Sequence, residues 1–274
     1  MRTPIEAEHN PLNHLGLEKD PNNQLKSIPL SRTPITRLEF LRAIALFLPN
    51  IWRVDKLFNY SYLPEVIKTL ETEKLEFALT IDDGWNKNVL ENMLNNLKEA
   101  NAHATFFLVA RAARHNIGAD LMQRLVNDGH EIGYHSVNHD DLGKLETWNS
   151  DQWNDDYTEW KKIMRNLLGN ELFDKGFNNL VRAPYGLFNS AVLRMCKDNQ
   201  LLPIGWSNSY FKNSENQLKL KVKAGNIIIL HVRQPDDQVL TGILSKKLTT
   251  LLPKSITEIL SSPPTSLARD ASFS

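Results

Sequence analysis

The chain of 274 residues contains a single cysteine, Cys196. One thiol cannot form a disulfide within the chain, and it cannot build a thiolate zinc cluster. Any metal site must therefore use histidine and carboxylate ligands. The absence of disulfides is compatible with a reducing or an oxidising compartment, so cysteine usage does not indicate a location.

An excess of charge of either sign is also lacking, since 32 Lys and Arg balance 32 Asp and Glu. No overall field then favours nucleic acid or an anionic membrane as a partner. A neutral substrate, such as a carbohydrate or another small molecule, is expected instead. Nothing in the composition indicates an oligomeric state.

Long apolar runs are missing as well. The stretch from Phe40 to Leu48 is interrupted by Arg42 and is followed by Pro49, whereas roughly twenty apolar residues are needed to span a bilayer. It is predicted to be an amphipathic helix on the domain, with a membrane-surface helix as the alternative. The first thirty residues do not show the basic and then apolar order of a secretory signal. The lack of a visible export signal favours the cytoplasm by sequence, but the location stays open, with an unusual export route as the alternative.

Composition and periodicity divide the chain into four parts. Residues 1–36 hold five prolines and no apolar period, which predicts a disordered or loosely docked arm. Residues 37–74 are predicted to form a helical extension. Strands and helices alternate over residues 75–255, and residues 256–274, rich in Ser and Pro, are predicted to be a disordered tail.

The alternation begins with a predicted strand at 75–81 and a helix at 86–100. Further strands are predicted at 104–110, 130–134, 180–182, 201–206 and 225–232, and further helices at 119–127, 150–168 (with Ser150 as N-cap), 190–199 and 238–252. Alternating strands and helices of these lengths are typical of βαβ units around a parallel sheet. The predicted fold is therefore α/β, an irregular TIM-like (β/α) barrel with an N-terminal helical or disordered extension.

Four polar segments each follow a predicted strand: 80–84 (Thr-Ile-Asp-Asp-Gly), 135–139 (His-Ser-Val-Asn-His), 182–185 (Arg-Ala-Pro-Tyr) and 230–231 (Leu-His). The carboxyl ends of barrel strands meet at one rim, where barrel enzymes carry their chemistry. One carboxylate and two imidazoles there would make a three-ligand metal site with a position open to water. The spacing of His135 and His139 places both on one side of a helical turn.

Each segment alone also has a structural explanation. Asp-Gly is ordinary turn chemistry, a histidine pair is often plain surface, and a rim arginine often forms a surface ion pair. His231 after four apolar residues could be a hydrogen-bonded core residue or an acid or base at the barrel mouth.

In order, content and spacing the four segments resemble the motifs of the polysaccharide deacetylases, carbohydrate esterase family 4, also called the NodB-homology domain. The resemblance covers roughly residues 75–252. The family motif T-F-D-D-G appears as 80–84 with Ile81 in place of Phe, H-(S/T)-x-x-H is intact at 135–139, R-x-P-Y lies at 182–185, and the closing leucine–histidine pair is Leu230-His231. The resemblance implies a metal-dependent hydrolase that removes N-acetyl groups from an N-acetylglucosamine-type polysaccharide or oligosaccharide.

Roles for the site residues follow from the same resemblance. Asp82 would be the general base and His231 the acid that protonates the departing amine. The ligands of the metal, usually zinc in this family, would be Asp83, His135 and His139.

The remaining expected roles concern positioning and the pocket. Arg182 would orient the general base, and Tyr185 would donate its backbone N–H to the oxyanion. Trp206 and Leu230 would line the acetyl pocket.

One departure from the family pattern is visible. The family commonly carries an aspartate shortly after the tryptophan, as a partner for the catalytic histidine, but residues 207–211 contain no acid. Asp236 or Asp237 could take that place. The alternatives left open are a deformylase or purine-ring amidohydrolase of the same superfamily, and a catalytically weakened metal- or carbohydrate-binding protein.

Overall fold

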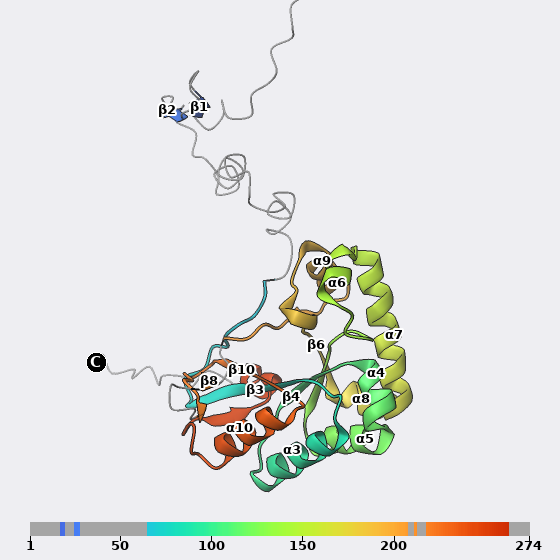
Figure 1. Cartoon of the computed structure of the whole chain (residues 1–274), viewed down its shortest axis with the longest axis vertical. Coiled ribbons are helices and arrows are strands. Elements are labelled where there is room, and N and C mark those ends of the chain that lie inside the picture. The colour runs from blue at the N-terminus through green and yellow to red at the C-terminus, as the bar shows by residue number, and fades with distance from the viewer. Residues whose placement is uncertain (1–16, 20–24, 28–64, 208–210, 213–217, 263–274) are drawn as a thin grey trace, which may run out of the picture. The chain divides into compact units, whose positions relative to one another are not determined.

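The computed structural model describes residues 17–19, 25–27, 65–207, 211–212 and 218–262, and the chain divides into two units, Met1–Tyr62 and Leu63–Ser274 (Figure 1). In the first unit, strands β1 (Leu17–Lys19) and β2 (Leu25–Ser27) pair antiparallel within the predicted arm. The rest of the arm, and residues 37–64 of the predicted helical extension, lie outside the described residues.

The second unit is built on a curved parallel sheet. Its strands follow the order β10 (Ile227–His231), β3 (Glu76–Asp83), β4 (Thr105–Leu108), β5 (Glu131–Tyr134), β6 (Phe177–Val181) and β7 (Leu202–Pro203). A further strand, β11 (Leu252–Lys254), pairs with the amino-terminal half of β3. Neighbouring strands are all parallel. The predicted α/β fold with an irregular (β/α) barrel is confirmed.

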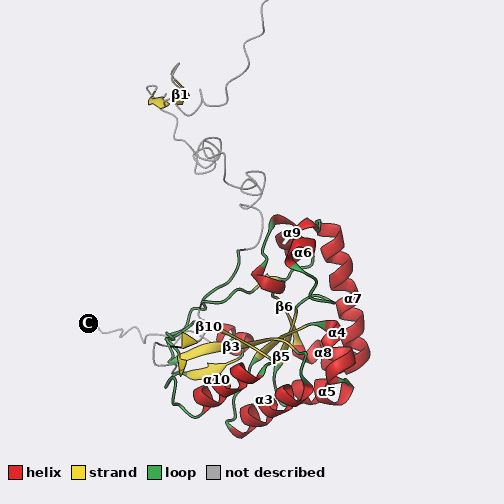
Figure 2. Cartoon of the chain, viewed as in Figure 1, coloured by secondary structure: helices red, strands yellow, loops and turns green. Residues whose placement is uncertain are grey.

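Helices surround the sheet, as Figure 2 shows. The longer ones are α3 (Lys87–Glu99), α5 (Ala119–Asn127), α7 (Ser150–Leu168), α9 (Ser190–Asp198) and α10 (Gln234–Leu244), and the shorter ones are α4 (Ala110–Ala112), α6 (Leu142–Thr147), α8 (Asn170–Gly176) and α11 (Ile256–Leu260). Helix α3 forms because apolar residues three and four positions apart bury one face against the sheet, among them Val89, Met93 and Leu97. Among the described helices, none has both the length and the apolar character needed to cross a bilayer.

One predicted N-cap was wrong, and the helix predicted at 238–252 was wrong at both ends, since α10 spans Gln234–Leu244. Helix α7 is capped by Asn149, not Ser150: the Asn149 side chain accepts the backbone N–H of Gln152, and the Gln152 side chain accepts that of Asn149. This reciprocal pair satisfies two amides at the helix start. Helix α10 starts at Gln234 and not at 238, because Pro235 fits the first turn of a helix, where its missing N–H costs no hydrogen bond.

Residues 65–74, the described end of the predicted helical extension, are not helical. They run between β7 and the start of β10: Ile67 N–H donates to Pro203 O (2.8 Å), Gly205 N–H donates to Ile67 O (2.8 Å), and Leu70 N–H donates to Gly225 O (2.7 Å). Backbone groups at both edges of the sheet need partners, and only an extended segment can serve both. This segment therefore bridges the two edges of the curved sheet.

The predicted disordered tail begins too early, because residues 256–260 form α11. Ser255 and Glu258 form a capping box, and Ile256 and Ile259 are buried. The helix is held to the sheet by buried Glu131, whose carboxylate accepts from Thr105 Oγ1 (2.9 Å), Ser255 Oγ (2.7 Å) and Thr257 N–H (3.0 Å). Residues 263–274 lie outside the described residues.

Candidate metal centre and catalytic site

Strand β3 ends in two carboxylates that take different environments. Asp82 is buried, whereas the side chain of Asp83 is partly exposed. Asp83 has φ 81°, and Gly84 follows with φ 105°. The left-handed region is uncommon for residues with a side chain but is tolerated by aspartate. The backbone therefore turns sharply between the two acids.

The two histidines of the 135–139 segment follow β5 in an irregular loop, not in the helical turn that their spacing suggested. Ser136 and His139 have φ values of 64° and 54°, and Ser136 Oγ accepts the backbone N–H of His139 at 2.9 Å. This tight turn brings the two rings to a centroid distance of 5.2 Å. The Nδ1 of His135 lies 2.6 Å from the carbonyl oxygen of Arg182. A carbonyl can only accept, so Nδ1 carries the proton and Nε2 is left as a ligand atom.

Asp83, His135 and His139 form one cluster. Asp83 Oδ1 lies 3.4 Å from His135 Nε2 and 3.7 Å from His139 Nε2, and one ligand atom from each residue lies within 4.8 Å of the others. Ligands about 2.1 Å from a tetrahedral ion are separated by roughly 3.4 Å. One carboxylate and two imidazoles at this spacing fit a divalent ion such as Zn²⁺.

The titration of the cluster is set by burial and mutual charge. Burial opposes ionisation of Asp83, but the hydrogen bond and charge of His135 outweigh it and lower the pKa of that carboxyl. Burial likewise opposes protonation of His135, yet Asp83 and Asp82 together raise its pKa. Burial and the neighbouring His135 lower the pKa of His139.

Asp82 is held beside this cluster by a buried guanidinium. Arg182 has no exposed surface, and it donates to Asp82 Oδ1 at 2.7 Å and to Thr80 Oγ1 at 2.8 Å. The rest of its fork is occupied by the carbonyl oxygens of Ile204 and Gly205. Burial lowers the pKa of Arg182, and the charge of Asp82 opposes that shift. The second carboxylate oxygen of Asp82 lies 3.9 Å from His135 Nε2.

His231 is the last residue of β10 and lies beside Asp82 in the register of β10 and β3. Asp236 in the first turn of α10 is fully buried, and its Oδ2 lies 3.2 Å from His231 Nδ1. Of the two aspartates that the sequence offered as a partner for His231, Asp236 is therefore the one in contact with it.

A cavity of about 680 Å³ is lined by the polar groups Asp82, Asp83, His135, His139, His231 and Asp236. The apolar part of its wall includes Trp206, whose ring would collide with a Cβ added at Gly186. Tyr185 is half exposed at the cavity, with φ 59°, and its ring lies 4.7 Å from that of His139. Leu230 does not line the cavity as predicted but is buried in the core, and Ile229 lines the cavity instead, because successive strand residues face opposite sides.

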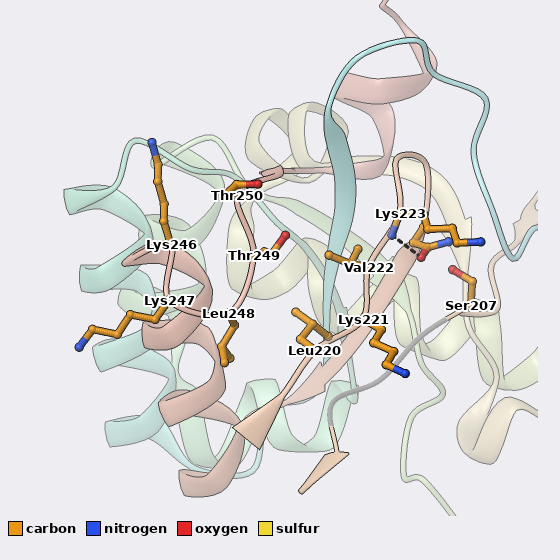
Figure 3. A pocket seen from close by; sticks show the side chains of 11 residues that line it. Ser207, Leu220, Lys221, Val222, Lys223, Lys246, Lys247, Leu248, Thr249 and Thr250 are labelled. Atoms are coloured by element: carbon orange, nitrogen blue, oxygen red, sulfur yellow. Dashed lines mark hydrogen bonds between the residues drawn. The ribbon is translucent and has the colours of Figure 1, made fainter. Parts of the chain in front are cut away.

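A larger cavity, about 840 Å³, lies near the amino-terminal end of β10 (Figure 3). Its wall carries four lysines and the hydroxyls of Ser207, Thr249 and Thr250, and none of its described lining residues is a carboxylate or an imidazole. In Figure 3 the amino groups of Lys246 and Lys247 point outward from its wall. Among the described residues, metal-ligand types gather at the smaller cavity and not here, so volume alone does not identify the candidate site.

Sequence reasoning missed three features of the site. Thr80 was quoted as part of a motif without a role, yet its hydroxyl accepts from Arg182 and donates to the carbonyl of Ile228. Ile229 could have been identified from alternation along the strand. The contact between Trp206 and Gly186 joins residues from separate loops, and no local signal predicts it.

Residues 69–204 match the family model described as polysaccharide deacetylase. The chain is similar to a peptidoglycan-N-acetylglucosamine deacetylase of Bacillus cereus, with 30% identity over 134 residues that cover 49% of this chain and 45% of the relative. It is also similar to a chitooligosaccharide deacetylase of Azorhizobium caulinodans, with 28% identity over 167 residues, which cover 58% and 75%. The chain spans about half the length of the first two curated relatives it matches, 57% and 45%.

Among solved structures, a pseudoenzyme of carbohydrate esterase family 4 from Bacillus anthracis superposes with a TM-score of 0.58 at 21% identity, covering 72% of this chain and 69% of the other. Identity at this level supports the fold only.

Proposed function

Because residues 69–204 belong to the polysaccharide deacetylase family, we propose that the chain is a metal-dependent hydrolase that removes N-acetyl groups from an N-acetylglucosamine-type polysaccharide or oligosaccharide. One observation carries the proposal. A carboxylate, Asp82, is fixed by buried Arg182 next to a three-ligand cluster to which it does not itself belong. Peptidoglycan and chitooligosaccharide deacetylases among the relatives support the substrate class.

The cation would be held by Asp83, His135 and His139, and the mixed oxygen and nitrogen donor set favours zinc. When bound, a divalent ion lowers the pKa of water towards ~7 and polarises the amide carbonyl.

The protein groups supply the proton transfers. Asp82 takes a proton from the attacking water, and Arg182 keeps that carboxylate in place. The water oxygen bonds to the carbonyl carbon, and the backbone N–H of Tyr185 donates to the developing oxyanion. His231, beside Asp82 on the neighbouring strand β10, protonates the nitrogen as the C–N bond breaks. The products are acetate and a free amine.

The test measures bound metal and acetate release in the full-length chain loaded with zinc, with acetylated glucosamine oligomers as substrate. Asp82→Asn is expected to keep the metal and to lose about 100-fold or more in kcat, because a general base is worth 10²–10⁴-fold. His135→Ala is expected to lose both metal and turnover. Asp237→Asn serves as the matched control. Acetate release at the wild-type rate from both site variants would refute the proposal.

A second candidate is a metal- or carbohydrate-binding protein with little turnover. It is motivated by the absence of an acid in residues 207–211. It predicts stoichiometric zinc without acetate or formate. Formate or a ring-opened product in place of acetate would instead indicate a deformylase or a purine-ring amidohydrolase.

A further inference from the structure

Asp236 is a fully buried carboxylate at the start of α10, next to the cavity. Its Oδ2 accepts the backbone N–H of His231 at 2.7 Å and lies 3.2 Å from the Nδ1 of the same residue. Its Oδ1 accepts from Nε of Arg233 at 2.7 Å. The carboxylate thus contacts both the main chain and the ring of one residue, and it restricts the rotation of that ring.

The chemistry of the contact determines which ring nitrogen carries the proton. An ionised carboxylate can only accept hydrogen bonds, so Nδ1 of His231 must donate to Asp236. Nε2 is then the nitrogen left for the cavity. Two features of the site favour the ionised form of Asp236. It lies in the first turn of an eleven-residue helix, where the dipole stabilises negative charge, and it is paired with the Arg233 guanidinium.

No other acid competes for this position within the described residues. Asp237 lies one residue further along the same turn, but its Oδ1 is buried without a hydrogen-bond partner there. The residues that follow Trp206, 207–211, contain no acid in the sequence.

We infer that Asp236 is the positioning residue that holds the His231 ring with Nε2 directed at the scissile nitrogen. The inference rests on the proposed function, in which His231 is the acid. Asp236 does not touch the substrate; it acts through His231. The fold thereby places the partner of the acid five residues after it in the chain, on α10, instead of after the tryptophan.

The first test is a double-mutant cycle on deacetylation by the zinc-loaded full-length chain. Asp236→Asn keeps the size of the side chain and is expected to lower kcat roughly 10- to 100-fold with little change in KM, less than the full value of a general acid. In a His231→Gln background the same substitution should change kcat less than about twofold, since the group it acts on is gone. Asp237→Asn, on the same helix turn, should leave kcat unchanged. An equal loss from Asp236→Asn in both backgrounds would overturn the inference.

The second test observes the His231 ring directly by NMR and does not depend on turnover. In the wild type, Nδ1 should carry the proton of the neutral ring. In Asp236→Asn, the preference for the tautomer protonated at Nδ1 should weaken. The other charged groups around the ring, Asp82 and Asp83 on β3 and Arg233 before α10, are the same in both proteins. An unchanged tautomer preference would refute the inference.

The two proposals fail in distinguishable ways. If the chain released no acetate but its His231 ring still responded to Asp236→Asn, the proposed function would be refuted. The contact between Asp236 and His231 would nevertheless be supported. If Asp236→Asn does not fold, Asp236→Glu provides the same readouts. Its longer carboxylate should preserve the Nδ1-protonated tautomer of the ring while kcat falls through misplacement of Nε2. If Asp236→Glu kept the wild-type kcat as well as the state of the ring, that result would count against a positioning role.

Discussion

The ion pair between Arg182 and Asp82 holds the proposed general base in place, and it also buries two charges whose separation would cost stability. Every hydrogen bond of the guanidinium is made inside the barrel. Its plane also packs over the Phe107 ring at 4.3 Å. Breaking such a pair from one side leaves an uncompensated buried charge, which costs about 3–5 kcal/mol.

Arg182→Met is therefore expected to lower the free energy of unfolding by about 3–5 kcal/mol and to abolish turnover. Arg182→Lys keeps the charge but not the planar guanidinium group. Its unfolding free energy and its turnover should therefore lie between those of the wild type and those of Arg182→Met. Urea denaturation and acetate release measure the two effects. A methionine variant as stable as the wild type would contradict this account of the pair.

His130 gives the fold a dependence on acid. It is buried, its Nε2 has no hydrogen-bond partner within the described residues, and burial lowers its pKa to about 4 from 6.5. Between these values the unfolded chain binds a proton that the folded chain does not, so stability falls as the pH drops from 6.5 to 4, by about 3 kcal/mol. Burial of Asp156 raises its pKa to about 6, which acts in the opposite direction over an overlapping range.

His130→Asn retains an acceptor for the Ala104 amide and removes the titration. Its unfolding free energy should depend less steeply on pH than that of the wild type between pH 6.5 and 4. Only the difference between the two proteins isolates His130, because Asp156 is present in both. Parallel stability curves for the two proteins would show that the ring does not titrate as argued.

At the residue scale, sequence reasoning identified most of the groups that the structure gathers at the cavity. It succeeded where a polar residue follows directly after a buried strand, as with Asp82 and His231. It could not choose between Asp236 and Asp237, because that choice depends on where α10 begins. A start at 238 leaves both in a loop, whereas the actual start at Gln234 turns Asp236 inward.

At the scale of elements, Gly225 shows how tightly the barrel is closed. Gly225 has φ 75°, and a Cβ there would overlap the carbonyl oxygen of Leu70. The backbone N–H of Leu70 in turn donates to the carbonyl oxygen of Gly225. Gly169 has a similar φ of 76° but open space around it. Comparing the two glycines therefore separates the cost of a positive φ, which both have, from the cost of a steric clash, which only Gly225 would have.

Gly225→Ala should destabilise the fold by about 1–3 kcal/mol more than Gly169→Ala, since only the first adds a clash to the unfavourable φ. Thermal or urea denaturation of the two variants gives the difference. Equal losses would mean that the segment around Leu70 can move aside at little cost.

Periodicity predicted the long elements well and the short ones poorly. Helix 119–127 was predicted with the boundaries that α5 has, because its apolar positions repeat strongly over nine residues. Strand β11 was missed because three residues that include a proline carry no pattern, and it exists only through pairing with β3. Such pairing is a long-range property.

At the scale of the whole molecule, the described residues 65–70 matter more than their length suggests. They serve as partner to both β7 and the start of β10 through three backbone hydrogen bonds, and Leu70 is buried there. No local pattern predicts that role, because it depends on where two distant strands leave their edges unpaired.

A chain that starts at Leu63 should keep the stability of the second unit, whereas one that starts at Leu75 should melt roughly 10 °C lower, through lost apolar burial and unpaired edges. Differential scanning calorimetry on both fragments measures this. Equal melting temperatures would show that the barrel does not need the segment.

The two ends of the barrel divide their tasks. The carboxyl ends of the strands carry the candidate site residues, while the Glu131 network, α11 and the hydrogen bond from Leu70 to Gly225 anchor the opposite end. Loops at the mouth are therefore free to diversify under selection while the distant anchor preserves the scaffold. A library randomised around Trp206 and Tyr185 should yield altered acyl or sugar preference far more often than unfolded protein.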